Sequence, residues 1–181
     1  KGIAKADVCS ILNGLVRWME TNQRISAPKK IAFEFSNIAI LALKSNGIIQ
    51  EQNNTISFCH QSYLDFLIAD RVVKEIEFGN SVLNWIGSRE SQTLFRREQL
   101  RQALSMLSED TPLNFLNTIK VILASAVRFH LKHLTLEVLG QVEVLTSELS
   151  SFCLELIGDS YWRMHTLDTV ILGKSTLVKL M

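Results

Sequence analysis

Proline and glycine are scarce in this chain of 181 residues, which contains two prolines and eight glycines. Both residues interrupt helices, so their scarcity leaves long stretches that can be helical. Leu, Ile, Lys, Glu and Gln, which favour helices or are tolerated in them, recur throughout the sequence. The composition therefore predicts a mainly α-helical fold with short connections.

Cysteine is also rare. Cys9, Cys59 and Cys153 are odd in number, lie far apart and form no C-x-x-C pair. This spacing argues against a disulfide framework and against a thiolate metal site. We expect three buried, reduced thiols in a cytoplasmic protein.

The chain has no excess of charge of one sign and no long apolar run. The chain has nineteen basic and eighteen acidic residues, which gives a formal net charge of +1. Because this charge is small, no long-range electrostatic attraction draws the chain to nucleic acid or to an anionic membrane. No run approaches the roughly 20 apolar residues of a membrane span, and the first residues lack the hydrophobic stretch of a signal peptide. We expect a soluble protein that contacts neither a membrane nor nucleic acid.

The first part of the chain has the element order of a winged helix. Apolar residues recur with helical spacing over residues 7–21, 28–45 and 62–78. Between the second and third helices, residues 48–58 contain two short β-compatible runs joined by a polar tip, which predicts a small hairpin. We therefore expect a winged-helix-like domain over residues 1–80.

Residues 81–181 show only helical patterns. We expect helices at residues 82–87, 91–108, 112–129, 131–142, 147–157, 161–172 and from 175 onward. The segment 134–140 is similar to 152–158, an offset close to one helix and its turn. This similarity predicts either an array of helical hairpins of the HEAT or armadillo kind or an irregular bundle. The chain begins without methionine and stops inside an apolar pattern, so we expect this second domain to be truncated at its C-terminus.

His60 lies where the hairpin is predicted to turn into a helix, because the alternating pattern ends at Phe58 and a helical spacing follows. We expect the apolar residues of this helix to lie in the core and the polar ones to shape the turn and cap the helix. The first group is Tyr63, Phe66 and Leu67, and the second is Gln61, Ser62 and Asp65. A histidine at such a junction either hydrogen-bonds to the backbone or reaches a neighbouring domain.

Residues 58–69 read aromatic-x-His-Gln-Ser-aromatic-x-acid-aromatic-x-x-Ala. This pattern resembles the signature near the end of the winged-helix domain of NACHT-type signalling NTPases, a family that includes NOD-like receptors and bacterial STAND proteins. The resemblance covers roughly residues 7–110, and Asp70 departs from it where the family often has a second alanine. It implies that His60 contacts the β-phosphate of ADP held by a nucleotide-binding domain of the same chain. ADP or ATP with Mg would then be the cofactor of the parent protein, and this segment would hold none.

The basic residues are most concentrated at Arg96, Arg97 and Arg101, which are candidate contacts for a partner or a phosphate. Only Phe95 supplies an aromatic ring among them, and acidic residues nearby balance the charge, which favours a solvated or internally salt-bridged face. The segment 94–102 also resembles the stretch that follows the winged helix in bacterial NACHT proteins.

Catalytic and metal-binding motifs are incomplete. Residues 173–176 read Gly-Lys-Ser-Thr like the end of a P-loop, but Asp168 occupies the position of the leading glycine, so we expect no nucleotide site there. His130 and His133 could grip a metal from one helix face, yet no further ligand stands at a useful spacing. We therefore expect no catalytic residues and no metal in this segment.

These expectations combine into three alternative functions. The first is a regulatory and sensor segment of a NACHT-type signalling ATPase of bacterial defence, whose partners are its own nucleotide-binding domain and a protein ligand or oligomer partner. The second is a winged-helix DNA-binding transcription module with a helical effector domain, which the few lysines of segment 28–45 argue against. The third is a helical scaffold for protein interaction.

Overall fold

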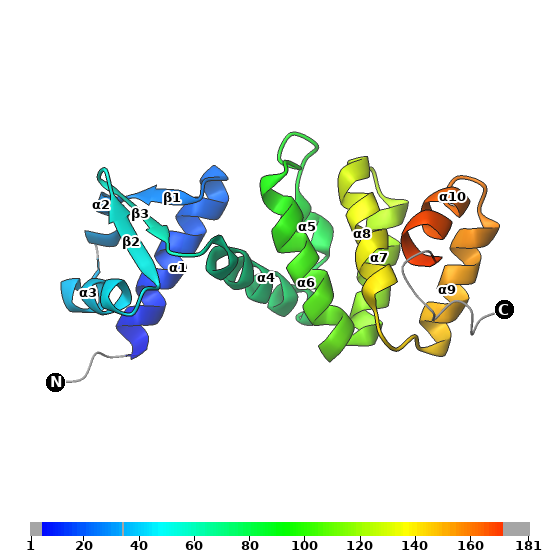
Figure 1. Cartoon of the computed structure of the whole chain (residues 1–181), viewed down its shortest axis with the longest axis horizontal. Coiled ribbons are helices and arrows are strands. Elements are labelled where there is room, and N and C mark those ends of the chain that lie inside the picture. The colour runs from blue at the N-terminus through cyan, green and yellow to red at the C-terminus, as the bar shows by residue number, and fades with distance from the viewer. Residues whose placement is uncertain (1–4, 34, 172–181) are drawn as a thin grey trace. The chain divides into compact units, whose positions relative to one another are not determined.

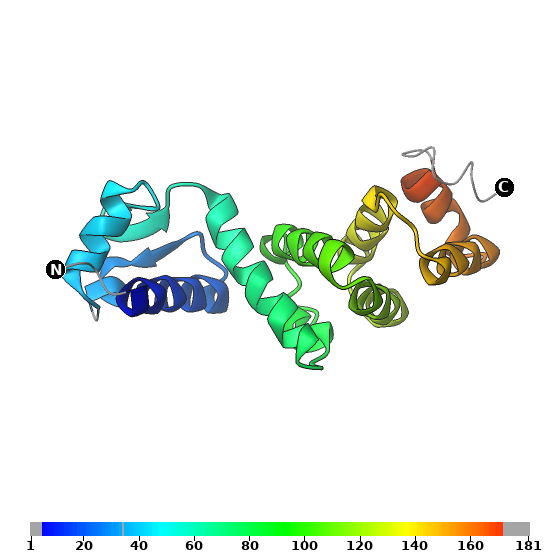
Figure 2. The same ribbon diagram turned by 90° about the horizontal axis from the view of Figure 1, so that it is seen from below.

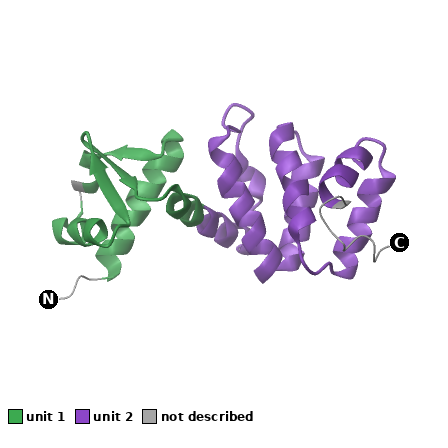
Figure 3. Cartoon of the chain, in the orientation of Figure 1, with its two compact units in different colours: residues 1–68 green, residues 69–181 purple. Residues whose placement is uncertain are grey.

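The computed structural model describes residues 5–33 and 35–171 (Figure 1). It is mainly helical, with one small antiparallel sheet, as the composition predicted. The chain divides into two compact units, Lys1–Ile68 and Ala69–Met181 (Figure 3). The division falls inside a helix, ahead of the boundary predicted after residue 80.

The first unit has the element order helix, strand, helix, helix, hairpin. Its elements are α1 (Lys5–Asn22), β1 (Ser26–Pro28), α2 (Lys29–Phe33), α3 (Asn37–Ser45), β2 (Ile49–Gln52), β3 (Thr55–Phe58) and the start of α4 (Gln61–Glu77). The strands form an antiparallel sheet in the order β1-β3-β2. Helix α1 packs against β1, α2 and α3, and Figure 2 shows it beside the strands. This is the arrangement of a winged helix, with the β2–β3 hairpin as its wing.

The hairpin turns over two residues, Asn53 and Asn54, which both have positive φ. A two-residue turn of this handedness matches the twist of the strands, and asparagine tolerates such φ values better than most residues. The strands therefore extend closer to the tip than the predicted loop of residues 51–54 allowed. The end predicted for the preceding helix at residue 45 is confirmed, since α3 ends at Ser45 and Gly47, with a φ of +66°, follows it.

The single helix predicted for residues 28–45 was wrong in two respects. Ser26 and Pro28 belong to strand β1, which pairs with β3 in the register Ser26 with Ser57 and Pro28 with Thr55. The remaining stretch is divided into α2 and α3, and α3 begins after Ser36, whose ψ of 119° is extended. The helical spacing of the apolar residues was real, but pairing with a distant strand took Pro28, the first predicted residue, out of the helix.

The second unit is an array of helices. It contains the rest of α4, then α5 (Val82–Ile86), α6 (Phe95–Asp110), α7 (Pro112–Ala124), α8 (Phe129–Gln141), α9 (Ser147–Gly158), α10 (Arg163–Thr166) and a π-helical segment, η1 (Leu167–Ile171). Helix α5 contacts α7, α6 contacts α7 and α8, and α8 contacts α10 and η1. Contacts between helices two places apart are typical of stacked helical layers. The two similar segments 134–140 and 152–158 lie in α8 and α9, so they relate consecutive helices and not successive hairpins.

Helix α4 ends at Glu77, within one residue of the predicted end at 78, and a glycine follows shortly after it. The amide of Gly79 donates to the carbonyl of Ile76 at 2.9 Å, and the amide of Asn80 donates to the carbonyl of Glu75 at 2.9 Å. Gly79 has a φ of +89°. This pair of hydrogen bonds with a left-handed glycine is the Schellman motif, which satisfies carbonyls that the helix end leaves open. The P-loop-like residues 173–176 and the helix expected from residue 175 lie outside the described residues.

Candidate functional site

His60 lies between β3 and α4, as the sequence predicted. Hydrogen bonds fix the chain on both sides of it: the amide of Cys59 donates to the carbonyl of Ile48 at 3.0 Å, and the amide of Tyr63 donates to the carbonyl of His60 at 3.1 Å. The side chain itself is exposed. Its ring meets that of Tyr63 edge to face, with the centroids 5.6 Å apart. Backbone and ring contacts thus hold the imidazole at the surface of the first unit.

The predicted core face of α4 was wrong for two of its three members, and the third, Leu67, is only half-buried. Tyr63 is 39% exposed and Phe66 is 47% exposed, while Leu64, Ile68 and Ala69 are buried. The turn at His60 sets the direction in which the helix starts. Successive residues lie about 100° apart around a helix, so a shift of one residue turns a different side of it toward the core. The periodicity therefore identified a helix but not which of its two apolar sides would be covered.

The residues His60, Tyr63 and Phe66 follow one another at intervals of three along one side of α4. We call these three residues the His60 face. All three are exposed. Gln61 and Ser62 are exposed in the first turn beside them, whereas Asp65 is buried and has a partner within the chain. The role of Asp65 in shaping the turn or capping the helix stays a prediction.

Two of the three candidate arginines are paired within the second unit. Arg101 donates from Nη2 to Oε2 of Glu137 at 2.7 Å, and Nη2 of Arg97 lies 3.3 Å from the same oxygen. Both arginines also face Glu98, at 3.4 to 3.5 Å. The pairs join α6 to α8. Their charge is thereby balanced inside the chain, the internally salt-bridged alternative that the sequence favoured.

Arg96 is partly buried against Trp85. Its guanidinium lies 4.8 Å from the centroid of that ring and donates from Nη1 to the carbonyl of the same residue. Burial lowers the pKa of this guanidinium. The side chain serves as a packing group between α5 and α6, through stacking on the indole ring.

The histidines 130 and 133 do not come together as a metal site. His133 Nδ1 lies 3.0 Å from Oε1 of Glu137, and the buried Nε2 of His130 has no hydrogen-bond partner. Burial, followed by the positive charges of Arg128 and Arg97, lowers the pKa of His130. Within residues 5–33 and 35–171, no three groups of the His, Cys, Asp or Glu type are placed to hold a metal ion.

A groove runs along α3 in the first unit. Its floor is apolar, with Ala32 and Ile56 fully buried and Ile40 nearly so, and its volume is about 330 Å³. At its mouth, Lys29 and Lys44 both pair with the carboxylate of Glu51, the latter at 2.9 Å. These two contacts lower the pKa of Glu51, hydrogen bonding to Lys29 first and to Lys44 second.

Helix α3 exposes two large apolar side chains, of which Leu41 also lines the groove. Ile38 is 67% exposed and Leu41 is 64% exposed. We call the groove together with Ile38 and Leu41 the α3 groove. The sequence carried a signal for it, because residues 38–43 are six consecutive apolar residues. A helix packed on one side cannot bury all of such a run.

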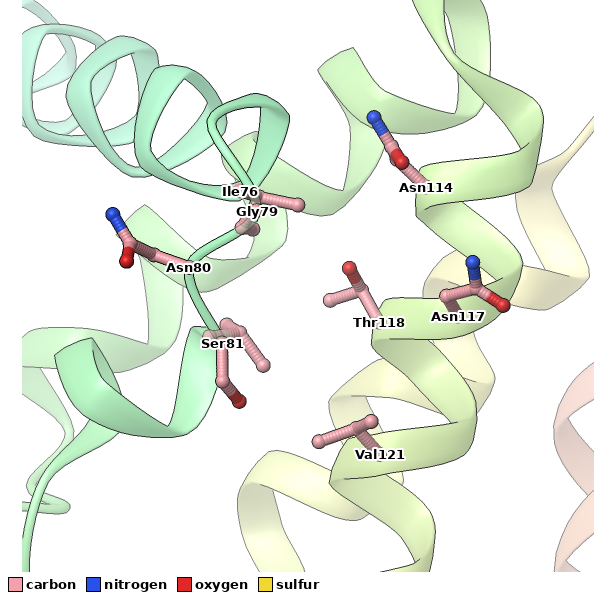
Figure 4. Close-up of a pocket in the computed structure, with 9 residues that line it drawn as sticks. Ile76, Gly79, Asn80, Ser81, Asn114, Asn117, Thr118 and Val121 are labelled. Atoms are coloured by element: carbon pink, nitrogen blue, oxygen red, sulfur yellow. The ribbon is translucent and has the colours of Figure 1, made fainter.

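A second groove lies in the second unit, between the end of α4 and helix α7 (Figure 4). Amide and hydroxyl side chains line it, from Asn80, Ser81, Asn114, Asn117 and Thr118. Asn80 is bonded to the carboxylate of Glu75 at 2.6 Å, and Ser81 caps α5. The groove holds about 260 Å³ and carries no ionised lining residue. It offers hydrogen bonds and no chemistry of acid, base or nucleophile.

None of the described helices is both long enough and apolar enough to cross a membrane. Comparisons of the sequence with protein-family models and with curated proteins, and of the structure with solved structures, gave no match.

Proposed function

We propose that the chain is a regulatory segment of a NACHT-type signalling ATPase, in which the first unit holds a nucleotide-binding domain closed and the helical array relays the binding of a protein ligand. The observation that supports this best is the His60 face. It presents an imidazole and two aromatic rings to the outside at the segment where the resemblance to that family is most specific.

The chemistry required of His60 is modest. An imidazole nitrogen can donate a hydrogen bond to a phosphate oxygen, and the bond becomes stronger when the ring is protonated. The edge-to-face contact with Tyr63 limits the orientations of the ring before any phosphate arrives. The segment supplies one donor and an apolar surface, while the parent protein supplies ADP or ATP, with Mg, and any hydrolysis.

In this proposal the contact acts as a conformational switch. A bond from His60 to ADP forms only when the nucleotide-binding domain lies against the His60 face, so ADP favours the closed state. Exchange for ATP, or a ligand bound by the helices of the second unit, removes this preference. A ligand can shift such an equilibrium only by its difference in affinity for the two states.

The test uses the full-length natural protein that contains this chain, as wild type and with His60→Ala. We expect the wild type to retain ADP through purification, and the variant to lose it and to assemble without stimulus. Gln61→Ala is the matched control, since Gln61 is exposed in the same turn and should leave ADP retention unchanged. The proposal would be contradicted if wild type and His60→Ala retained ADP equally. It would also be contradicted if the full-length natural protein had no nucleotide-binding domain.

The DNA-binding alternative starts from the winged-helix topology. In such a module α3 would enter the major groove with polar and basic side chains. Here α3 exposes Ile38 and Leu41, and its lysine Lys44 is paired with the carboxylate of Glu51. We therefore expect no salt-dependent binding of a labelled duplex at about 150 mM salt in the micromolar range, where nonspecific binders become detectable. Micromolar binding that weakens steeply with salt would favour the DNA-binding function.

The scaffold alternative needs only the stacked helices of the second unit. It predicts a protein ligand for that unit and no effect of His60→Ala on nucleotide. The ADP experiment therefore separates it from the regulatory function.

A further inference from the structure

We propose that the groove between the end of α4 and helix α7 binds an extended, uncharged segment of a partner protein through hydrogen bonds to its backbone. We call it the amide groove, after the asparagines 80, 114 and 117 that line it together with Ser81 and Thr118. The groove supplies the protein-ligand site of the second unit, which rests on the proposed function, whereas the binding itself needs neither nucleotide nor His60.

Thr118 points into the amide groove. Its side chain is only 5% exposed, and Figure 4 shows it directed from α7 toward the segment that follows α4. A threonine in a helix can donate to the carbonyl four residues earlier, as Thr135 of α8 does to Leu131 at 2.9 Å. The hydroxyl of Thr118 makes no hydrogen bond to any residue that the structure describes. Because a buried hydroxyl without a partner is costly, a ligand that bonds to it is favoured.

The asparagines of the groove match the chemistry of a peptide group. Asn114 and Asn117 follow each other at an interval of three residues on α7, and their side-chain amides bond to nothing in the described part of the chain. Each amide offers an oxygen acceptor and an NH₂ donor, and each residue of an extended chain offers one N–H and one C=O. On the opposite wall, Nδ2 of Asn80 donates to the carboxylate of Glu75 at 2.6 Å, so its oxygen is the atom that can accept. The groove can therefore pair with both backbone groups of an extended segment.

The size and shape of the groove suit a chain that passes through it. Helix α7 contributes Asn114, Thr118 and Val121 at intervals of three to four residues, so the groove follows the helix axis. Its volume of about 260 Å³ is below the roughly 300 to 1,000 Å³ of sites that enclose a drug-sized molecule. Ile76 and Val121 provide a small apolar surface, which can take an aliphatic side chain of the segment.

Other classes of occupant fit this lining less well. A helix uses its own N–H and C=O groups internally and would leave Asn114 and Thr118 buried without partners. A charged ligand would lose water and find no opposite charge, because none of the described lining residues is ionised. A nucleobase would find no aromatic ring to stack on among the same residues. An extended neutral segment satisfies both the donors and the acceptors of the lining.

The test uses the full chain, isotopically labelled for NMR, and a pooled set of blocked peptides of about six residues. This length matches α7, whose 13 residues measure about 20 Å, at about 3.3 Å per residue of extended chain. Threonine occupies alternate positions, and the others carry Ala, Val, Leu or Ile. We expect the peptides to shift the side-chain amide signals of Asn114 and Asn117, with an apparent Kd below about 1 mM. A second set, N-methylated at its peptide nitrogens, should bind at least about tenfold more weakly, because it lacks the backbone donors.

Variants on α7 complete the test. The Asn114→Ala, Asn117→Ala double variant should lower the affinity by at least about tenfold, and Thr118→Val, which keeps the shape, by a smaller factor. Thr118→Val should unfold at the same urea concentration as the wild type or a higher one, because the lost hydroxyl had no partner among the described residues. Asn13→Ala is the matched control, since Asn13 is exposed on α1 in the first unit.

Three results would overturn the proposal: no shift at about 1 mM peptide, equal binding of the two peptide sets, or wild-type affinity in the folded double variant. Stronger binding of a helix-forming peptide of alanine and aminoisobutyric acid would assign the groove to a helix instead. These measurements contain no nucleotide, so they can fail while the ADP experiment succeeds, and the reverse.

Discussion

Arg101 and Glu137 are separated by 36 residues in the chain, and a hydrogen bond of 2.7 Å joins Nη2 of the first to Oε2 of the second. Arg97 and His133 converge on the same carboxylate, at 3.3 Å and 3.0 Å. One glutamate on α8 thus gathers three partners, two of them from α6. The side chain is one quarter exposed, so water screens the charges only partly.

Replacing this carboxylate should loosen the contact between α6 and α8. We expect Glu137→Gln to lower the free energy of unfolding by about 1 to 2 kcal/mol, because two arginines lose their charged acceptor at a partly buried position. Urea denaturation followed by circular dichroism measures this. Glu98→Gln is the control: it faces the same arginines but is 48% exposed, and should cost less than about 1 kcal/mol. An equal effect of both substitutions would refute this ranking.

The contribution of Glu137 should disappear in acid. Burial raises the pKa of Glu137, but the hydrogen bond and charge of Arg101 and the charge of Arg97 outweigh it, so that the pKa lies below its ordinary value of 4.5. A group with a lowered folded pKa stabilises the protein above its unfolded pKa and loses this effect as the pH falls through the folded value. We expect the stability difference between wild type and Glu137→Gln to be constant above about pH 5 and to shrink below pH 4.5. A difference as large at pH 3 as at pH 7 would contradict the assignment.

The glycines Gly140 and Gly158 occupy equivalent places in the two similar segments, but only the first is tightly packed. A Cβ on Gly140 would lie 2.6 Å from the carbonyl oxygen of Thr169 and 3.1 Å from Cα of Val170, both backbone atoms of η1. A Cβ on Gly158 would meet nothing within 4 Å. We expect Gly140→Ala to destabilise the chain by about 1 to 3 kcal/mol, and Gly158→Ala to change it by less than about 1 kcal/mol. Thermal unfolding of the two variants checks this, and equal melting temperatures would show that η1 does not press on α8.

The cysteines should differ in reactivity, contrary to the expectation of three buried thiols. Cys153 is fully buried and burial raises its pKa to about 11, whereas Cys9 is exposed and Cys59 is intermediate. Because the thiolate is the reactive form, we expect iodoacetamide at pH 8 to modify Cys9 first and to leave Cys153 unmodified in the folded chain. Peptide mass spectrometry with and without denaturant gives the measurement. Early labelling of Cys153 in the native chain would show that α9 opens locally.

Short-range features of this protein were readable from its sequence. Scarce proline and glycine predicted the helices, the apolar spacing gave the ends of α3 and α4 to within one residue, and the change of period at Phe58 placed His60 between a strand and a helix. Turn residues and apolar spacing act within one or two turns of the chain, so they need no knowledge of the rest of the fold.

Long-range features were decided only by the tertiary structure. Strand β1 exists because it pairs with β3, the buried side of α4 depends on what lies against it, and Glu137 selects arginines 36 and 40 residues away. The run of apolar residues in α3 showed that some of them would stay exposed, but only packing against α1 and the wing determined that these are Ile38 and Leu41. Such choices depend on contacts between distant segments, which a local pattern does not encode.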